Sequence, residues 1–323
     1  MINNNVLFEM SMIWDDNSFD FFKLLIDMLP FKPKHMMPVT SNKKMKYNDA
    51  LFYCELFDAL KKKIKFSTSV SQDFNNSFTL RYDYISNVIT IVVFLEDYVP
   101  KKIDVDSINK LFCKFKILSA LIRNEDDGLL STAYKISTYE RRGIDTSSLK
   151  KIINTPFKDE IIDIEQFSRH SHEYGGIQFT STYIMWFGTD FFRFVPQETL
   201  TSFNDCFSNE TLENGTVRIQ LYENINDFDT EETDRRQWAF RRHTNIDEVA
   251  EKWNLEYLQM ASRNKSGANM EIETGIFEHG GVKLVKMYLD SENKPAPKKL
   301  AYKMKCHEYD SSGRVLSEYE ILM

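Results

Sequence analysis

The chain has 323 residues, of which 42% are hydrophobic and 14% aromatic, so it can bury a sizeable core and is not expected to be disordered. Its 48 acidic and 41 basic residues give a formal net charge of −7, which argues against the phosphate-neutralising surface that nucleic-acid binding needs. A basic protein partner fits this balance better, because opposite charge accelerates encounter and helps to exclude wrong partners.

The cysteine pattern and the N-terminus both favour a cytoplasmic protein. Cys54, Cys113, Cys206 and Cys306 are scattered, with no C-x-x-C pair and no histidine at zinc-finger spacing, so we expect reduced thiols and no bound cofactor. Residues 1–5 lack the basic and apolar regions of a secretory signal. No apolar run approaches the roughly 20 residues that span a membrane, so no membrane partner is expected.

The first predicted elements are a strand and a helix. Apolar residues alternate over 6–14, which predicts a strand with one buried face. From residue 19 to 28 the apolar spacing becomes helical, with Ser18 as a candidate cap and Pro30 as the stop.

Two further helices and a hairpin are predicted before residue 125. An apolar stripe predicts a helix over 48–64, whose terminal lysines complement the helix dipole and are interpreted as a solvated end. Strands over 78–84 and 87–95 form a predicted hairpin. A broad apolar face predicts a third helix over 107–123.

The order of elements predicts the fold class α+β, with mostly antiparallel sheets, segregated helices and two domains. A loose boundary near 125–128 divides the chain into domains 1–127 and 128–323. Turn-separated apolar segments predict antiparallel strands in the tail, over residues 273–277, 281–289, 298–307 and 314–322.

The most informative segment combines aromatic strands with opposite charges. Strands are predicted over 177–187 and 217–222, an acidic stretch follows over 223–234, and an arginine-rich helix follows over 235–243. Thr233 and Asp234 are candidate N-caps of that helix. The arginines are interpreted as internal partners of the preceding acids, as partner contacts or, less in keeping with the acidic chain, as a nucleic-acid surface.

The acidic stretch has three interpretations: a solvated loop, a contact surface for a basic partner, or a calcium loop. Asp227, Asp229 and Glu231 alternate as calcium ligands do, but Glu232 stands where such a loop needs Gly and Trp238 where it needs a bidentate Glu. The contact-surface interpretation assigns acids to steering and aromatic residues to anchoring. Its predicted partner-binding residues are Tyr222, Glu223, Asp227, Phe228, Asp229, Glu231, Glu232 and Trp238.

His170 and His172 form the most enzyme-like cluster. On a strand these two side chains point to the same side and can share a metal with a distant carboxylate. No third ligand stands at a recognised spacing, and the main interpretation is a pair of surface or interface histidines. Phosphate loops and the G-x-S-x-G nucleophile motif are also absent from the sequence, so an enzyme is not the favoured class.

The order of segments resembles the larger immunity proteins of bacterial polymorphic toxin systems. The resemblance covers the second half of the chain and lies in residues 175–188, 217–223, 237–241 and 246–250. It implies a cytosolic α+β protein, usually without catalysis, that binds one toxin and blocks its active site or its activation.

The resulting hypothesis is a non-enzymatic immunity protein that neutralises a cognate toxin by occlusion. A phage-encoded or plasmid-encoded inhibitor of a host defence protein is an alternative that would also act by binding and occluding a protein, and it differs only in its target. A metal-dependent hydrolase built on His170 and His172 is an alternative of another class.

Overall fold

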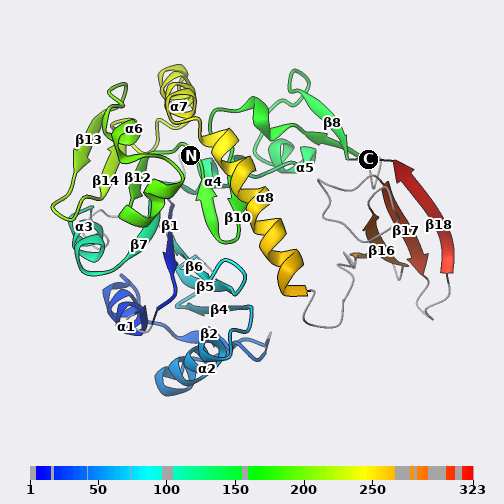
Figure 1. Ribbon diagram of the computed structural model, residues 1–323, viewed down its shortest axis with the longest axis horizontal. Helices are drawn as coiled ribbons and strands as arrows, with labels where there is room; N and C mark the ends of the chain where they lie inside the picture. The colour runs from blue at the N-terminus through cyan, green and yellow to red at the C-terminus, as the bar shows by residue number, and fades with distance from the viewer. Residues whose placement is uncertain are drawn as a thin grey trace. The chain divides into compact units, whose positions relative to one another are not determined.

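The computed structural model describes residues 5–15, 18–41, 43–73, 75–96, 105–154, 159–265, 277–279, 282–289, 303–309 and 315–322. It divides into two compact units, Met1–Asn254 and Leu255–Met323. Both units contain antiparallel sheets and the helices lie largely in separate segments, so the predicted α+β class is confirmed (Figure 1).

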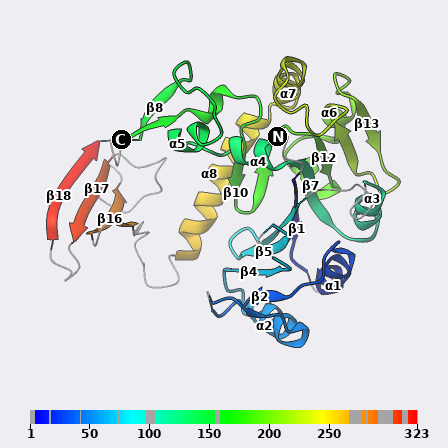
Figure 2. The ribbon, with the colours of Figure 1, turned by 180° about the vertical axis from the view of Figure 1, so that it is seen from behind.

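Unit 1 is built on a ten-stranded antiparallel sheet of order β13-β14-β12-β7-β1-β6-β5-β4-β2-β3 (Figure 2). Its strands are β1 Val6–Ile13, β2 His35–Met37, β3 Met45–Lys46, β4 Phe66–Ser71, β5 Ser77–Asp83, β6 Val88–Leu95, β7 Ile117–Asn124, β12 Ile184–Phe187, β13 Ser208–Thr211 and β14 Val217–Gln220. The expected domain boundary at 127/128 falls inside this sheet, because β12 to β14 continue the sheet that β1 to β7 begin. The unit boundary lies instead between Asn254 and Leu255.

The predicted first strand is confirmed, but both of its faces are buried. β1 pairs with β6 and with β7, so that Glu9 lies opposite both Val92 and Leu121. Phe8 and its alternate neighbours face an apolar core, while Glu9 and Ser11 are buried on the other face. The polar positions of this strand therefore mark a second packed layer.

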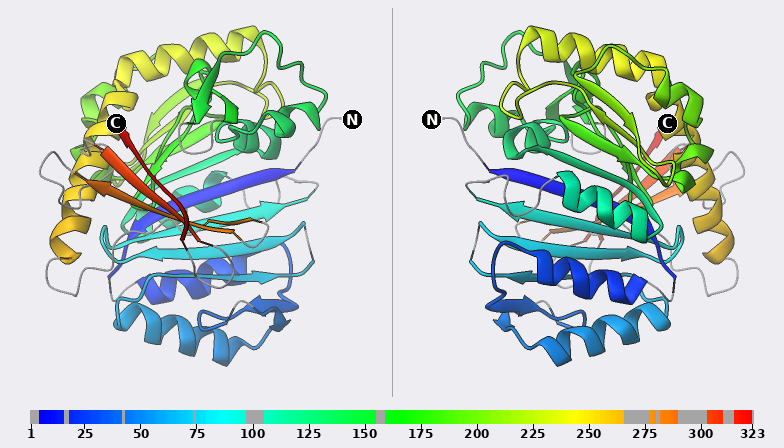
Figure 3. Two further views of the ribbon diagram at one scale, coloured as in Figure 1. Left: turned by 90° about the vertical axis from the view of Figure 1, so that its right-hand side faces the viewer. Right: turned by 90° about the vertical axis from the view of Figure 1, so that its left-hand side faces the viewer.

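Three helices cover the apolar face of the sheet (Figure 3): α1 Ser18–Met28, α2 Asp49–Lys61 and α3 Val105–Lys114. Each buries one stripe, as Phe52, Leu56 and Leu60 do on α2. Asn48 caps α2 by accepting a hydrogen bond from the Leu51 N–H. The predicted helices at these positions and the predicted β5–β6 hairpin are thus present.

The helix predicted over 107–123 is wrong in its second half. The helix α3 ends at Lys114, and Ile117–Asn124 forms β7, every residue of which is buried between β1 and β12. A continuous apolar run is compatible with a buried helix or with a strand covered on both faces, and here the sheet decides. Gly188 adjoins this strand so closely that a Cβ atom would lie 1.9 Å from the Ile117 carbonyl oxygen.

A second layer of short elements contains α4 Glu125–Leu130, α5 Ile136–Glu140, η1 Ile164–Gln166 and two hairpins, β8 Lys151–Asn154 with β9 Asp159–Ile162, and β10 His172–Tyr174 with β11 Ile177–Phe179. The β10–β11 hairpin lies on the polar face of the sheet. At its turn the Gly176 carbonyl accepts hydrogen bonds from Ser11 at 2.6 Å and Thr90 at 3.0 Å. A Cβ atom at Gly176 would lie 2.7 Å from Thr90 Oγ1, and its φ of +78° also favours glycine.

The rest of unit 1 is formed by η2 Thr189–Arg193, α6 Gln197–Thr201, α7 Glu231–Thr244 and the start of α8 Ile246–Lys265. The strand predicted over 177–187 is two strands, β11 and β12, which belong to different sheets. The arginine-rich helix begins earlier than predicted, and Thr230, not Thr233 or Asp234, is its N-cap, accepting from the Thr233 N–H.

Unit 2 contains a four-stranded antiparallel sheet of order β15-β16-β17-β18. Its strands are β15 Phe277–His279, β16 Val282–Leu289, β17 Lys303–Tyr309 and β18 Val315–Leu322. The antiparallel tail predicted from the sequence is therefore present, while the predicted strand positions 273–276, 281, 298–302 and 314 lie outside the described residues.

Candidate functional site

His170 lies in the connection between η1 and β10 and is buried, with 3% of its surface exposed. Its Nδ1 is 2.6 Å from the Phe167 carbonyl oxygen, which can only accept, so Nδ1 carries the proton. His172, on β10, places its ring 5.1 Å from that of His170. Of the two placements in the main interpretation, surface or interface, the surface placement is wrong for His170, which is buried beside Arg241 of α7.

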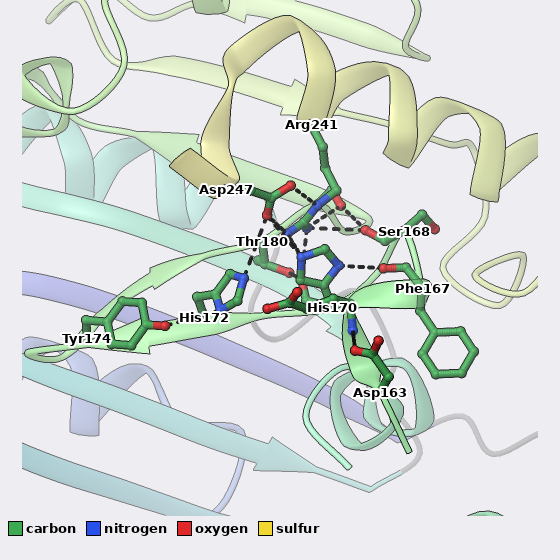
Figure 4. Close-up of polar contacts among 11 residues, drawn as sticks. Asp163, Phe167, Ser168, His170, His172, Tyr174, Thr180, Arg241 and Asp247 are labelled. Atoms are coloured by element: carbon green, nitrogen blue, oxygen red, sulfur yellow. Dashed lines mark hydrogen bonds and ion pairs between the residues drawn. The ribbon is translucent and has the colours of Figure 1, made fainter. Parts of the chain in front are cut away.

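Arg241 enters the same region from the last turns of α7 (Figure 4). Only 2% of the residue is exposed, and its guanidinium donates to the carbonyl oxygens of His170 at 2.8 Å and Ser168 at 3.2 Å. It also donates to Ser181 Oγ at 3.1 Å. These bonds connect α7 to the connection before β10 and to the segment between β11 and β12.

Asp247 completes the cluster from the first turn of α8. Asn245, in the left-handed conformation with φ 52°, ends α7 and allows α8 to begin at Ile246. The Asp247 carboxylate forms an ion pair with Arg241 and lies 3.0 Å from His170 Nε2 and 3.8 Å from His172 Nε2. Burial alone would raise the pKa of this carboxyl, but hydrogen bonds from His170 and Arg241 and the charge of Arg241 hold the pKa well below its usual range.

The His170 ring meets a donor and an acceptor at the same nitrogen. Its Nε2 is 2.5 Å from Arg241 Nη2 and 3.0 Å from an Asp247 oxygen. A neutral ring accepts from Arg241 there, whereas a protonated ring donates to Asp247. In either state the nitrogen has a partner, so the cluster satisfies its own polar groups.

The alternative that the two histidines and a distant carboxylate share a metal needs three donor atoms close together, and the structure brings Asp247 to the pair. Donor atoms of His170, His172 and Asp247 lie within 4.8 Å of one another, and among the described residues this is the one group with such spacing. Histidine nitrogens and a carboxylate oxygen suit a transition metal. The Arg241 guanidinium nevertheless contacts two of the three possible metal ligands, His170 Nε2 and the Asp247 carboxylate. Its positive charge therefore already stands where a metal ion would have to bind.

The acidic segment 223–234 lies between β14 and the first turn of α7 and is largely exposed. Exposed acids with no ion pair among the described residues are Glu223, Asp227, Asp229, Glu231 and Asp234. Glu232 differs, because it pairs with Arg235 and with Arg236. The expected pairing of the helix arginines with the preceding acids is therefore confined to Glu232.

Asp205 is the carboxylate that sequence reasoning missed in this region. It pairs with Arg235 at 2.5 Å and lies 4.0 Å from Arg236, and these contacts lower its pKa. Nothing in the spacing of the sequence signals this contact across 30 residues. Two arginines of α7 are thus occupied by Asp205 and Glu232, which leaves the other acids of the segment without a neutralising partner there.

The predicted aromatic anchors are not exposed. Tyr222 is 3% exposed and packs against Tyr183, so it belongs to the core and not to a contact surface. Phe228 and Trp238 are half-buried, the first under Arg169 and the second beside His170. The exposed aromatic residue of this region is Phe207, which has 51% of its surface exposed.

Phe207 lies at the start of the acidic segment. Its N–H donates to the Gln220 carbonyl at 2.9 Å, immediately before β13 pairs with β14, and Gln220 is three residues before Glu223. An exposed aromatic side chain can anchor a protein contact, and exposed carboxylates can steer a basic partner toward it. We call residues 223–231 together with Phe207 the acidic surface.

The buried Asp127 carboxyl lies close enough to the acidic surface for the charge of Asp229 to act on it. Thr182 donates to Asp127 Oδ2 at 2.6 Å, and burial raises the pKa of this Asp127 carboxyl although Arg169 opposes the shift. Asn124 donates to Asn226 Oδ1 at 3.0 Å and thereby connects the end of β7 to the segment. This hydrogen bond fixes the position of Asn226, within the acidic surface, relative to the sheet.

A cavity lies on the polar face of the sheet, beneath β11. Its polar lining includes Glu9, Ser119 and Gln178, and its volume is about 20 Å³. Small-molecule sites occupy about 300–1,000 Å³, so this cavity is too small for a substrate.

Comparisons with protein-family models, with curated proteins and with solved structures each return no match for this chain. Among the described residues, no helix combines the length and hydropathy of a membrane span.

Proposed function

We propose that this chain is a non-enzymatic binding protein that holds a basic protein partner against the acidic surface. In the most concrete form of the proposal, given by the resemblance to immunity proteins, the partner is a cognate toxin that is neutralised by occlusion. The carrying observation is the set of exposed carboxylates at Glu223, Asp227, Asp229 and Glu231, which have no ion pair among the described residues.

The contrast with Glu232 supports this assignment. Glu232 and Asp205 are used to hold the α7 arginines, so internal pairing accounts for them. It does not account for the four neighbouring acids, whose mutual repulsion a cationic partner would relieve. Their field would accelerate encounter with such a partner, and Phe207 would supply an aromatic contact inside the polar surroundings.

Co-purification from the native host at low salt, followed by mass spectrometry, tests the proposal. A neighbouring gene's basic product bound at 1:1 supports it. Matched charge-reversal variants then test the surface: Asp227→Lys, Asp229→Lys and Glu231→Lys in one protein, and Asp159→Lys, Glu160→Lys and Glu213→Lys, all exposed elsewhere, in the other.

We expect the first variant to lower the association rate by about 10-fold or more at low salt, and the second to leave it near the wild-type value. Phe207→Ser should accelerate dissociation, because it removes the aromatic contact without changing the charge. Equal loss in both charge variants would show that only net charge matters, and would contradict the assignment to this surface.

A phage-encoded or plasmid-encoded inhibitor of a host defence protein would use the same surface. The identity of the co-purifying protein separates the two: a toxin from the adjacent gene supports immunity, and a host defence protein supports the alternative.

A metal-dependent hydrolase is a second candidate, favoured by the spacing of His170, His172 and Asp247. A metal would have to displace Arg241 from Asp247, which leaves a buried guanidinium without its carboxylate. Stoichiometric metal in the purified protein that is lost in His172→Ala would support this candidate. Metal content far below one per chain, in wild type and variant alike, would eliminate it.

A further inference from the structure

The opposite edge of the ten-stranded sheet has the opposite charge. β2 and β3 form that edge, whereas β13 and β14, which precede the acidic surface, form the other (Figure 1). Residues 31–46 contain lysines at 32, 34, 43, 44 and 46 and no Asp, Glu or Arg. All of these lysines are exposed, and none has an ion pair among the described residues.

An open hollow of about 660 Å³ lies among these residues. It is lined by Pro33, Lys34, His35, Lys44, Met45, Lys46 and Tyr47. The hollow is open on its outer side, so a bound molecule would remain partly in solvent and would be held mainly by charge. We call this feature the lysine hollow.

Backbone pairing fixes the walls of the lysine hollow. The Lys34 N–H donates to the Ser71 carbonyl at 2.9 Å, and the Tyr47 N–H donates to the Lys34 carbonyl at 2.9 Å. His35 pairs across the hairpin with Lys46. The lysine side chains therefore start from a defined frame, although their ends remain in solvent.

Two further side chains, His35 and Tyr47, line the lysine hollow beside the lysines. His35 Nδ1 is buried with no hydrogen-bond partner among the described residues, so the ring has an unused polar atom beside the hollow. Tyr47 contributes an aromatic face, while its hydroxyl donates to Asp49 at 2.7 Å. The charges of Asp27 and Asp49 act on Tyr47, and Lys34 acts on Asp73, so negative charge also borders the site.

Protection of a sheet edge explains only part of this arrangement. Lysines on edge strands discourage pairing with other chains, and this accounts for Lys46 on β3. Lys34 and His35 belong to β2 and its approach, one strand inside the edge, where no such protection is needed. Edge protection also does not require a hollow.

We propose that the lysine hollow binds a compact phosphate-rich anion, of the class of inorganic or nucleoside triphosphates. Lysine ammonium groups act as point charges that suit clustered phosphates, whereas fork-like recognition of single carboxylates favours arginine, and the first arginine of the chain is Arg81. Three lysines surround one small hollow, which fits several charges on one small molecule better than the spaced carboxylates of an acidic peptide.

Isothermal titration of the full chain with inorganic tripolyphosphate and with ATP tests the proposal. We expect saturable 1:1 binding of both at moderate salt. Tighter binding of ATP would assign a contribution to the Tyr47 ring, and equal binding would assign recognition to the phosphates alone.

The decisive variant carries Lys34→Gln, Lys44→Gln and Lys46→Gln. Its matched control carries Lys61→Gln, Lys62→Gln and Lys63→Gln, which remove the same charge from the exposed end of α2. We expect the dissociation constant for tripolyphosphate to rise at least 10-fold in the hollow variant and less than 2-fold in the control. Thermal unfolding of both variants checks that the fold is retained.

Three results would overturn the proposal. The first is no saturable binding at millimolar tripolyphosphate, and the second is an equal rise of the dissociation constant in both variants. The third is tighter, hollow-dependent binding of an oligoglutamate peptide or a single-stranded oligonucleotide, which would assign the site to a macromolecule. The acidic surface takes no part in this titration, so its outcome is independent of the proposed function.

Discussion

The two ends of α7 use charge in opposite ways. At the C-terminal end, Arg241 is buried and bound to Asp247, His170 and two carbonyl oxygens. At the N-terminal end, Glu231 and the acids before it are exposed, and within the described part of the chain Glu232 alone of the acids in 223–234 has an ion pair. The buried end holds three segments together, whereas the exposed end leaves charge available to another molecule. Changes at the first end should therefore affect stability, and changes at the second should affect binding.

The largest effect on stability is expected from Asp247→Asn. The substitution leaves the Arg241 guanidinium buried without its carboxylate, which costs about 3–5 kcal/mol in buried pairs. We expect about 3 kcal/mol, the low end of that range, because the side chain of Asp247 is 40% exposed and asparagine keeps one acceptor. Urea unfolding measures it, with Arg242→Ala as an exposed control expected within about 0.5 kcal/mol of wild type. Equal losses in both would contradict the structural role of the cluster.

The same carboxyl predicts a stability loss in acid. Its pKa is depressed in the folded protein relative to the ordinary value of about 3.9, so its contribution is full above about pH 4 and is lost as the pH falls toward the folded value. Unfolding free energy measured from pH 6 to pH 2 should fall more steeply below pH 4 in the wild type than in Asp247→Asn. Parallel curves would refute this assignment.

A smaller effect is expected at the N-terminus of α7. Thr230 accepts from the Thr233 N–H, so Thr230→Ala should cost about 1 kcal/mol of unfolding free energy. Asp234 makes no cap bond and lies inside the helix, so Asp234→Ala should cost about 0.5 kcal/mol, from the helix dipole alone. Thermal or urea unfolding measures the loss of stability in each variant. A larger loss in Asp234→Ala than in Thr230→Ala would show that Asp234, as predicted from the sequence, is the N-cap.

The smallest effect on stability is expected from reversing charge on the acidic surface. A variant with Asp227→Lys and Asp229→Lys should unfold within about 0.5 kcal/mol of the wild type, because these exposed side chains lie before the helix and have no internal partner among the described residues. Urea unfolding and the partner-binding assay on the same variant show whether these acids contribute to binding without contributing to stability. A loss of several kcal/mol would mean that the acids serve the fold.

Local patterns predicted the elements that local chemistry determines. The helical spacing of Leu51, Cys54, Phe57, Leu60 and Ile64 predicts a helix here, and α2 is present, but the buried stripe is Phe52, Leu56 and Leu60, while Phe57 and Ile64 are exposed. The broad apolar face over 107–123 predicts one helix, but pairing with the flanking strands β1 and β12 makes residues 117–124 a strand. Tertiary pairing overrides the local pattern there.

The candidate site likewise contains some features that the sequence indicates and others that depend on tertiary packing. The spacing of His170 and His172 places both side chains on one side of a strand, where a distant carboxylate could join them, and the carboxylate that lies there is Asp247. Arg241 could not be assigned to them, because its place depends on the Asn245 corner and on how α7 packs against residues 168–181. The acidic surface was visible as composition, but the burial of Tyr222 and the exposure of Phe207 follow only from the sheet.

The central place of β1 has a consequence for how the chain folds. This strand precedes both of its partners in the chain, which lie at residues 88–95 and 117–124, and the sheet extends to β12, β14 and β13 only from residue 184 onward. Closing such long loops costs entropy before any pairing compensates, which slows folding of sheets with distant partners. During synthesis β1 therefore has no strand partner until residues 88–95 have emerged, and it lacks its second partner until residues 117–124 have followed. We expect refolding to be slow and to depend on protection of this N-terminal strand.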